Sequence, residues 1–335
     1  MSERLGERTI TLTAPVVIAS SAGVAGKKEK EGPLGSFFDK TYTDDSLGEA
    51  TWEKAESRLQ QEAAQMALTK GGFTAQDMHV VLSGDLLDQC ISSTFGLRSF
   101  GIPLLGQFGA CSTMAQTMLV GALLCEGGGA VRAMAVTSSH FCTAERQFRM
   151  PLSYGGQRTP TAQWTVTGAG AAILQAGGEG PRICHVTPGR IVDLKVSDAN
   201  NMGAAMAPAA ADTIAAYLRD TGTSPSAYDM ILTGDLGHIG SQLLQELMER
   251  EGLPLGSVHQ DCGKLIFNRT VQDVHAGGSG CGCCGSVFCS YIMERLRRGA
   301  IRNMLFAATG ALMSPTSSQQ GESIPSICHL LHITA

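Results

Sequence analysis

The sequence has few charged side chains and no long apolar segment, and both shortages limit what the protein can be. Asp, Glu, Lys and Arg make up only 16% of the 335 residues, with 25 basic against 30 acidic side chains and a net charge of −5. Because nucleic-acid binding requires a surplus of basic side chains, we expect no nucleic-acid partner. We find neither a signal peptide nor the roughly 20 apolar residues that cross a bilayer, so any membrane association is expected to be peripheral.

Disulfide pairing is not indicated either, although the chain has 11 cysteines. This number is odd, and Cys125 and Cys289 lie inside apolar runs, where a reduced thiol acts as a small hydrophobic side chain. We therefore expect free thiols in an intracellular protein. The 41 glycines, together with 43% hydrophobic residues, predict closely packed elements in a layered α/β fold.

A repeated motif divides the chain into two halves. Residues 81–86 read Val-Leu-Ser-Gly-Asp-Leu, and residues 231–236, at an offset of 150, read Ile-Leu-Thr-Gly-Asp-Leu. Each copy is an apolar strand that enters a Gly-Asp turn, and each follows an amphipathic helix, over about 52–70 and 208–220. Pro208 fits the first turn of the second helix. At an offset of 170, strand 133–137 also matches 303–307.

This duplication predicts a five-layered αβαβα sandwich made of two related halves, with mixed sheets covered by helices. We place the halves at residues 1–180 and 181–335. Segments 27–45 and 141–164 show little periodicity but many Gly, Pro, Ser and charged residues. They are predicted to be long ordered loops, which often line binding sites.

The main candidate for chemistry is Cys111, in the segment Phe-Gly-Ala-Cys-Ser-Thr at 108–113. The pattern predicts a strand before this turn and a helix after it, to about Glu126, so the thiol stands at a helix N-terminus, which lowers a thiol pKa. Ser112 adds a hydroxyl at the same turn. From spacing alone, Cys111 could equally be an inert thiol that fills a crowded turn.

A second polar group follows the strand 133–137, at the carboxyl end where α/β sheets commonly bind ligands. Its hydrogen-bonding side chains are Ser138, Ser139 and His140. Arg146 and Arg149 are three positions apart, on one face if the segment is helical, and could hold a carboxylate by paired hydrogen bonds. An internal ion pair with Glu145 is an equally weighted alternative.

A cysteine cluster in the Gly-rich segment 275–286 raises the question of a metal site. Its possible ligands are His275, Cys281, Cys283 and Cys284. A zinc site normally needs a second ligand pair, for which Cys262 and Cys289 are the nearest candidates. Because the glycines are typical of the entry to a buried helix, we interpret the cysteines as small buried thiols and expect no metal and no cofactor.

The turn around Cys111 resembles the nucleophile turn of thiolases and ketoacyl synthases, whose fold is also duplicated. In that superfamily a His–His or His–Asn pair from the second half activates the thiol and polarises the thioester. Here Gly234 stands where the synthases carry a His, and cysteines and glycines fill the place of the second partner. The resemblance therefore implies the fold with a vestigial nucleophile and no turnover. His238 could act as the base only after a shift in register.

Segments 139–149, 206–213 and 309–317 resemble one branch of this superfamily, the stage V sporulation protein AD family, and 22–41 is also similar. The resemblance runs from about residue 19 to 327. It implies a subunit that binds dipicolinic acid, alone or as its calcium chelate, in forespore machinery that moves this acid into the spore. A part in its release is left open. It further implies a peripheral place at the inner membrane, membrane partners from the stage V sporulation A machinery, and a homodimer.

Dipicolinic acid is a flat aromatic dianion, so its site needs donors for two carboxylates and an apolar slot for the ring. By motif position, the expected ligand-binding residues are Cys111, Ser112, Ser138, Ser139, His140, Arg146 and Arg149. One of the two arginines would face a carboxylate. Two other functions stay open. One is a thiolase-type acyltransferase or condensing enzyme that uses Cys111 with His238 or His140 as base. The other is a scaffold that docks membrane subunits.

Overall fold

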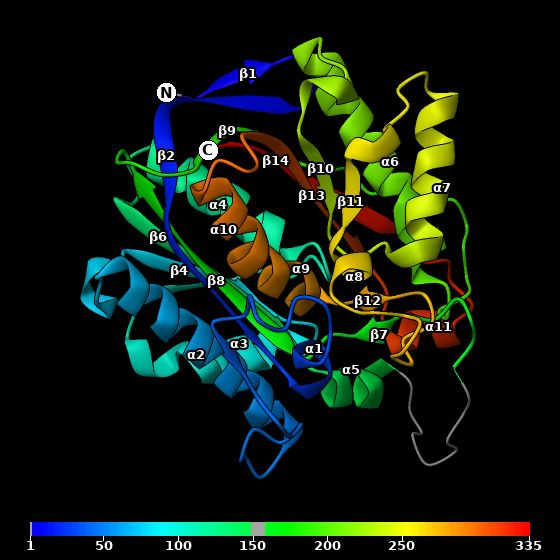
Figure 1. Cartoon of the computed structure of the whole chain (residues 1–335), viewed down its shortest axis with the longest axis horizontal. Coiled ribbons are helices and arrows are strands. Elements are labelled where there is room, and N and C mark those ends of the chain that lie inside the picture. Colours follow the sequence, from blue (N-terminus) through cyan, green and yellow to red (C-terminus); the bar gives the residue numbers. More distant parts are fainter. Residues whose placement is uncertain (1, 149–157) are drawn as a thin grey trace.

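A continuous mixed sheet runs through the whole molecule in the computed structural model, which describes residues 2–148 and 158–335 (Figure 1). Along its main path the strands are, in spatial order, β11 (His259–Asp261), β10 (Met230–Thr233), β13 (Asn303–Ala311), β14 (Ser326–Thr334), β9 (Arg182–Thr187), β2 (Thr9–Ala25), β8 (Gly168–Ala176), β6 (Arg132–Ser139), β4 (Val80–Gly84) and β5 (Leu104–Gly106). Two short strands pair with β2, namely β1 (Glu3–Leu5) and β3 (Lys40–Thr41). A separate two-stranded sheet joins β12 (Gly278–Ser279) and β7 (Trp164–Thr165).

The strand order confirms the duplication. One half of the sheet reads β2-β8-β6-β4-β5, and the other reads β9-β14-β13-β10-β11. Corresponding pairs also have the same direction: β4 and β6 are parallel, as are β10 and β13, whereas β6–β8 and β13–β14 are antiparallel. The halves join where β2 pairs with β9.

Helices cover this sheet in layers. They are α1 (Lys27–Lys30), α2 (Trp52–Gly71), α3 (Ile91–Leu97), α4 (Thr113–Glu126), α5 (Phe141–Phe148), α6 (Met202–Thr221), α7 (Gly237–Arg250), α8 (Cys262–Leu265), α9 (Cys281–Val287), α10 (Met293–Arg297) and α11 (Pro315–Gln319). A π-helical turn, η7 (Phe288–Ile292), joins α9 to α10. Short 3-10 turns are η1 (Ala75–Asp77), η2 (Asp88–Cys90), η3 (Arg98–Phe100), η5 (Pro225–Ala227) and η6 (Gly256–Val258).

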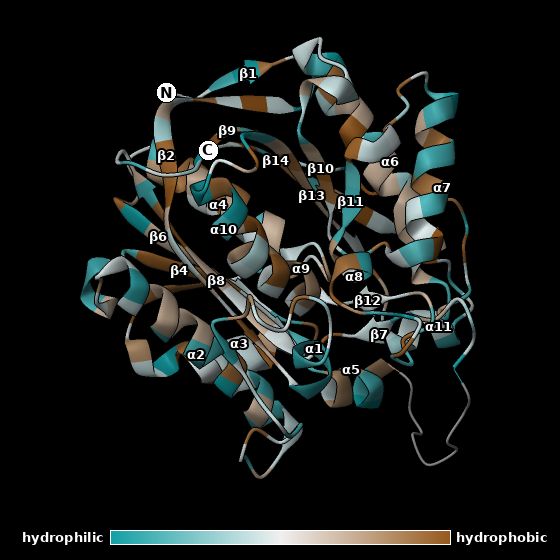
Figure 2. Cartoon of the chain, in the orientation of Figure 1, coloured by the Kyte–Doolittle hydropathy of each residue, from teal (hydrophilic) through white to brown (hydrophobic). Residues whose placement is uncertain are grey.

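Helices α4 and α9 lie at the centre, α2 and α3 cover the first half, and α6 and α7 cover the second half (Figure 1). This arrangement is the predicted αβαβα sandwich. Figure 2 shows apolar residues gathered along the inner strands and polar residues on the outward turns of α7. Among the helices of residues 2–148 and 158–335, none combines the length and the apolar character needed to span a membrane.

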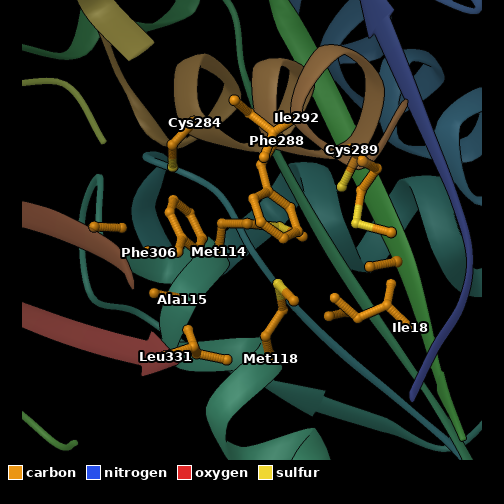
Figure 3. Packing of buried hydrophobic residues seen from close by; sticks show 14 of the residues in the cluster. Ile18, Met114, Ala115, Met118, Cys284, Phe288, Cys289, Ile292, Phe306 and Leu331 are labelled. Carbon is orange, nitrogen blue, oxygen red and sulfur yellow. The ribbon is translucent and has the colours of Figure 1, made fainter. Parts of the chain in front are cut away.

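The core between the halves is filled by side chains from both of them. Met114 and Met118 of α4 lie beside Phe288, Phe306 and Leu331 from the second half (Figure 3). The rings of Phe288 and Phe306 stack with centroids 4.6 Å apart. Because this interior is shared, the division at residue 180, which falls between β8 and β9, stays a prediction about domains.

The repeat extends to the helix caps. Thr51 caps α2 by accepting a hydrogen bond from the Lys54 N–H, and Asn201 caps α6 at the equivalent position. Gly72 and Gly222 end the two helices at φ values of 68° and 65°, in the left-handed region that glycine adopts without strain. The expectation that Pro208 begins its helix is wrong, because the Asn201 cap starts α6 earlier and leaves this proline inside the helix.

The two segments predicted as loops contain regular structure. Residues 141–148 form helix α5, and the segment 27–45 contains α1 and β3. The prediction of loops was therefore wrong for α5, whose eight residues bury Thr143, Ala144 and Glu145 on one side. Short amphipathic helices of this kind give too few periods to be recognised in sequence. Within the second segment, residues 149–157 lie outside the described residues, and Trp164 at its end begins β7.

Candidate functional site

Cys111 stands at a tight turn between β5 and α4, as predicted. Ala110, just before it, has a φ of 49°, and the Ser112 hydroxyl donates to the Gly109 carbonyl over 2.7 Å. Strand β13 approaches this turn so closely that a Cβ on Gly310 would lie 2.1 Å from the Gly109 oxygen. The turn and the thiol are therefore held from both halves of the molecule.

The side chain that meets the Cys111 thiol is Asp235, in the second Gly-Asp turn. The thiol donates a hydrogen bond to this buried carboxylate. Asp235 also accepts hydrogen bonds from the Gly280 N–H at 2.8 Å, from the Ser279 hydroxyl at 3.2 Å and from the Thr309 hydroxyl at 3.3 Å. Gly234 occupies the position of the missing histidine, and the role of its neighbour was not predicted from the sequence. The signal that could have found Asp235 is the repeated Gly-Asp turn.

The surroundings of Cys111 oppose ionisation of its thiol. Burial, followed by the nearby Asp235 carboxylate, raises the pKa of Cys111 well above its ordinary value. Burial also raises the pKa of Asp235, to about 7. The expectation of a lowered thiol pKa at the helix N-terminus is therefore wrong, because desolvation and a facing acid outweigh the helix dipole. At neutral pH this pair holds a neutral thiol.

His140 and His238 were considered as bases for the Cys111 thiol. The Nε2 atom of His140 lies 2.7 Å from the Asp45 carbonyl, and its Nδ1 accepts a hydrogen bond from the Cys142 N–H. Both ring nitrogens of His140 are thus engaged away from the thiol. His238 lies in the first turn of α7, and burial, with smaller effects of Arg269 and Lys264, lowers its pKa.

A cavity of about 270 Å³ opens beside Cys111. Its walls come from α5, β7, β12, the segment 199–206 and the end of β13, and they are mostly apolar. The lining residues are Leu86, Phe108, Ala110, Cys111, Ala144, Glu145, Phe148, Gln163, Thr165, Ala199, Asn200, Met202, Met206, Ser279, Ala311 and Met313. This volume is near the lower end of ligand pockets, roughly 300–1,000 Å³, so the cavity suits a small molecule.

One ion pair stands at the wall of this cavity. Arg158 contacts the Glu145 carboxylate at 3.1 Å and also donates to the Gln163 carbonyl. Its guanidinium lies 5.0 Å from the centre of the Trp164 ring, which stacks on Phe141 at 3.8 Å. Arg158 therefore has a fixed place behind two residues that line the cavity. The sequence offered an internal ion pair between Glu145 and Arg146 or Arg149. In the structure, Arg158 forms an ion pair with Glu145.

The polar residues at the end of β6 support the fold around the cavity. The Ser138 hydroxyl donates to Glu56 at 3.0 Å, and the Ser139 hydroxyl donates to the Val166 carbonyl at 2.7 Å. The Gly282 N–H, in α9, donates to Ser139. These serines are fully buried, as is His140, and they tie β6 to its neighbours. Ligand contacts by Ser112, Ser138, Ser139 and His140 stay predictions.

The arginines predicted to face a carboxylate are placed differently. Arg146 forms an ion pair with Glu53 of α2, and its guanidinium lies 5.5 Å from the centre of the Trp52 ring. Its side chain is half exposed. A role of Arg146 at a ligand stays a prediction, although its present partner is an acid of the neighbouring helix. Arg149 lies outside the described residues.

The cysteines of α9 are buried and donate to backbone carbonyls. The thiols of Cys281, Cys283 and Cys284 point to the carbonyls of Ser138, Gly234 and Cys111, respectively. Burial raises the pKa of all three thiols well above its ordinary value. Within residues 2–148 and 158–335, no group of three or more His, Cys, Asp or Glu side chains is arranged to hold a metal ion.

Comparisons with known proteins agree with this architecture. The chain resembles 3-oxoacyl-[acyl-carrier-protein] synthase III from Aquifex aeolicus VF5, with a TM-score of 0.57, 12% identity and coverage of 96% of this chain and all (100%) of that one. It also resembles a variant of OleA from Xanthomonas campestris, with a TM-score of 0.62, 12% identity and coverage of 97% of this chain and 99% of that one. At these identities the likeness shows a thiolase-like fold.

Sequence comparison is more specific. The chain is 45% identical over 324 residues to Stage V sporulation protein AD of Bacillus subtilis (strain 168), which covers 97% of this chain and 96% of that protein. The family model for Stage V sporulation protein AD matches residues 6–334. The chain therefore belongs to the stage V sporulation protein AD family, and it has the thiolase-like fold.

Proposed function

We propose that the protein is a non-catalytic receptor for dipicolinic acid that takes part in the uptake of this acid by spores, alone or as its calcium chelate. Its family supports a place in sporulation. The observation that carries the proposal is the cavity beside Cys111, in which the thiol is hydrogen-bonded to a buried carboxylate rather than to a histidine. A cavity of this kind can bind a small molecule without reacting with it. Release of the acid during germination would use the same cavity.

The residues that line the cavity support a flat aromatic acid as the ligand. Leu86, Phe148 and Met206 give it apolar walls for a ring. The Cys111 thiol and the Ser279 hydroxyl are donors on its polar side. A ligand with two carboxylates on one ring would therefore place the ring against the apolar walls and one carboxylate at these donors.

For the second carboxylate we assign Arg158. Its guanidinium is hydrogen-bonded to Glu145 and Gln163, which both line the cavity, so it lies directly behind the cavity wall. A planar guanidinium binds a carboxylate through two parallel hydrogen bonds. The ligand carboxylate would compete with Glu145 for this cation. Arg146 and Arg149, for which the sequence predicted this role, remain the alternatives.

Calorimetric titration of the purified protein with dipicolinic acid tests the proposal. Isophthalic acid, which has the two carboxylates but no ring nitrogen, is the control ligand. We expect saturable binding of dipicolinic acid and weaker binding of isophthalic acid. Arg158→Ala should weaken binding by about 2–5 kcal/mol, the range for breaking a buried charge pair, whereas Arg146→Ala should change it little. Absence of heat and of thermal stabilisation would contradict the proposal.

The acyltransferase alternative has its own test. A condensing enzyme must form a thioester at Cys111, which requires a thiolate at the moment of attack. We expect no acylation of Cys111 after incubation with acyl-coenzyme A substrates of short and medium length. Intact-protein mass spectrometry measures the added acyl mass, and Cys111→Ala is the control. A stoichiometric adduct that this variant lacks would establish the enzyme.

The proposed setting is the forespore and the spore, at the surface of the inner membrane, with other membrane subunits of the same machinery as partners. The family membership supports this setting. Membrane fractions of sporulating cells should retain the protein, and a high-salt wash should release it. We also propose a homodimer, because β5 is the open end of the sheet and carries exposed apolar side chains.

A further inference from the structure

Asp235 lies behind the wall of the cavity, and hydrogen bonds connect it to residues that line the cavity. Its carboxylate accepts hydrogen bonds from the Cys111 thiol and from the Ser279 hydroxyl, and both donors line the cavity. Its backbone carbonyl accepts a hydrogen bond of 2.6 Å from Gln163, a third lining residue. Asp235 itself is fully buried. Whatever binds in the cavity therefore meets Asp235 through these neighbours.

The surroundings of Asp235 contain further acids and thiols. Several titratable groups interact electrostatically with Asp235. They are Cys111 before α4, Asp261 at the end of β11, Cys262 in α8, and Cys283 and Cys284 in α9. Burial raises the pKa of these thiols, so they stay neutral near pH 7, and it raises the pKa of Asp261 to about 6. Across the cavity, Glu145 is paired with Arg158. Among the groups named here, none brings a cation to Asp235.

This geometry gives the two protonation states of Asp235 different effects on the cavity. An ionised carboxylate accepts from both Cys111 and Ser279, so their hydrogens point away from the cavity. A neutral carboxylic acid needs fewer donors, and the thiol and the hydroxyl can then turn their hydrogens to a ligand. A ligand carboxylate beside these donors would also repel a negative charge on Asp235.

We propose that Asp235 takes up one proton from solvent when an anionic carboxylate ligand binds beside Cys111 and Ser279, so that binding by this protein is coupled to a proton. The inference rests on the proposed function, and it adds Asp235 as a positioning residue that acts through the two donors. The carboxylate gains the proton, and the buffer loses it. No other covalent bond is made or broken.

The coupling has a definite sign. In the free protein, burial raises the pKa of Asp235 to about 7, and a bound anion raises it further. Affinity should therefore be constant below about pH 7 and fall up to tenfold for each pH unit above it. Asp235→Asn carries a neutral side chain of the same shape at every pH. Its affinity should not depend on pH in this range, and at pH 8.5 it should exceed that of the unchanged protein.

Titration calorimetry with dipicolinic acid, at pH 7.5 in phosphate and in Tris, measures the proton directly. These buffers differ in ionisation enthalpy, so the difference between the two heats gives the number of protons taken up. We expect a value between one half and one for the unchanged protein and near zero for Asp235→Asn. A pH-indicator dye in weakly buffered protein gives the same number without any variant, in case Asp235→Asn does not fold.

The outcomes separate the two proposals. Binding with equal heats in both buffers and an affinity that is flat from pH 6 to 8.5 would overturn the proton coupling alone. Proton uptake that persists in a folded Asp235→Asn protein would overturn the assignment to this residue. Absence of binding at every pH would overturn the proposed function, and the coupling with it.

Discussion

At the scale of the residue, the partner of Cys111 decides what its thiol can do. A histidine would take the thiol proton, whereas the buried Asp235 carboxylate accepts a hydrogen bond from the S–H group and opposes its ionisation. We expect iodoacetamide at pH 8 to alkylate Cys111 at least about tenfold more slowly than free cysteine in the same solution. Asp235→Asn removes the opposing charge and should speed the reaction. Mass spectrometry of the peptide with Cys111 measures both rates, and fast alkylation of the unchanged protein would support the acyltransferase.

Glu29 allows a second prediction at this scale. Its carboxyl group is buried, one of its oxygens has no hydrogen-bond partner among the residues that the structure describes, and burial raises its pKa to about 8. The folded state therefore binds the proton more strongly than the unfolded state, so stability falls as the pH rises from about 4.5 to 8, by at most about 1.4 kcal/mol per unit. Glu29→Gln should remove this loss. Thermal unfolding at pH 6 and pH 8.5 should show a gain for Glu29→Gln at both values that is clearly larger at pH 8.5. The exposed Glu3→Gln is the control, and a gain equal at both values would contradict the mechanism.

At the scale of the element, the central helix of the second half lies directly on a strand of the first. A Cβ on Gly170 of β8 would lie 2.0 Å from the backbone oxygen of Gly285 in α9, so neither element can move away without opening the core. We expect Gly170→Ala to cost at least about 3 kcal/mol of unfolding free energy through overpacking. Gly106 of β5 has no atom within 4 Å of the same added Cβ. Gly106→Ala should therefore be nearly neutral in urea unfolding, and similar losses for both variants would contradict this account.

The elements also show what the sequence could predict. The offset of 150 residues located α2 and α6 and the strands that follow them, because each unit repeats an apolar pattern, a polar connection and a Gly-Asp turn. The start of α6 was missed because a proline suggested a first turn, whereas Asn201 caps the helix before it. Helix α5 was missed because eight residues are too few for a clear period. Capping and short helices depend on contacts that no pattern records.

At the scale of the whole molecule, the site is built from residues of both halves that face each other. Asp235 of the second half faces Cys111 of the first, and Asp85 of the first half, in the matching turn, acts on Cys281 at the start of α9. The offsets of 150 and 170 residues that relate these pairs are visible in the sequence. The sequence does not show which residue of one half faces which residue of the other, because this depends on how the halves pack. For this reason the sequence predicted Cys111 and the cavity's place in the fold, but neither Asp235 nor Arg158.

The open edge of the sheet leads to a prediction for the assembly. Strand β5 ends the sheet, and three large apolar side chains in it or just after it, Leu104, Leu105 and Phe108, are between 39% and 49% exposed. An unpaired apolar edge of this kind is unfavourable in water unless another strand covers it. A second copy that pairs β5 with β5 through a twofold axis would extend the sheet and bury these side chains. We therefore expect a dimer at micromolar concentration.

Leu105→Glu tests this edge, because it places two like charges opposite each other across the twofold axis. We expect light scattering after size-exclusion chromatography to give the mass of a dimer for the unchanged protein and of a monomer for the variant. Ile191 is 65% exposed and precedes Val192, which pairs with Ser326 of β14 in the other half, so Ile191→Glu is the matched control and should stay dimeric. Circular dichroism should be the same for all three proteins. Since Phe108 belongs to both the edge and the cavity wall, a monomeric variant should also bind dipicolinic acid more weakly. A monomeric unchanged protein, or a dimeric Leu105→Glu variant, would show that this edge is covered in some other way.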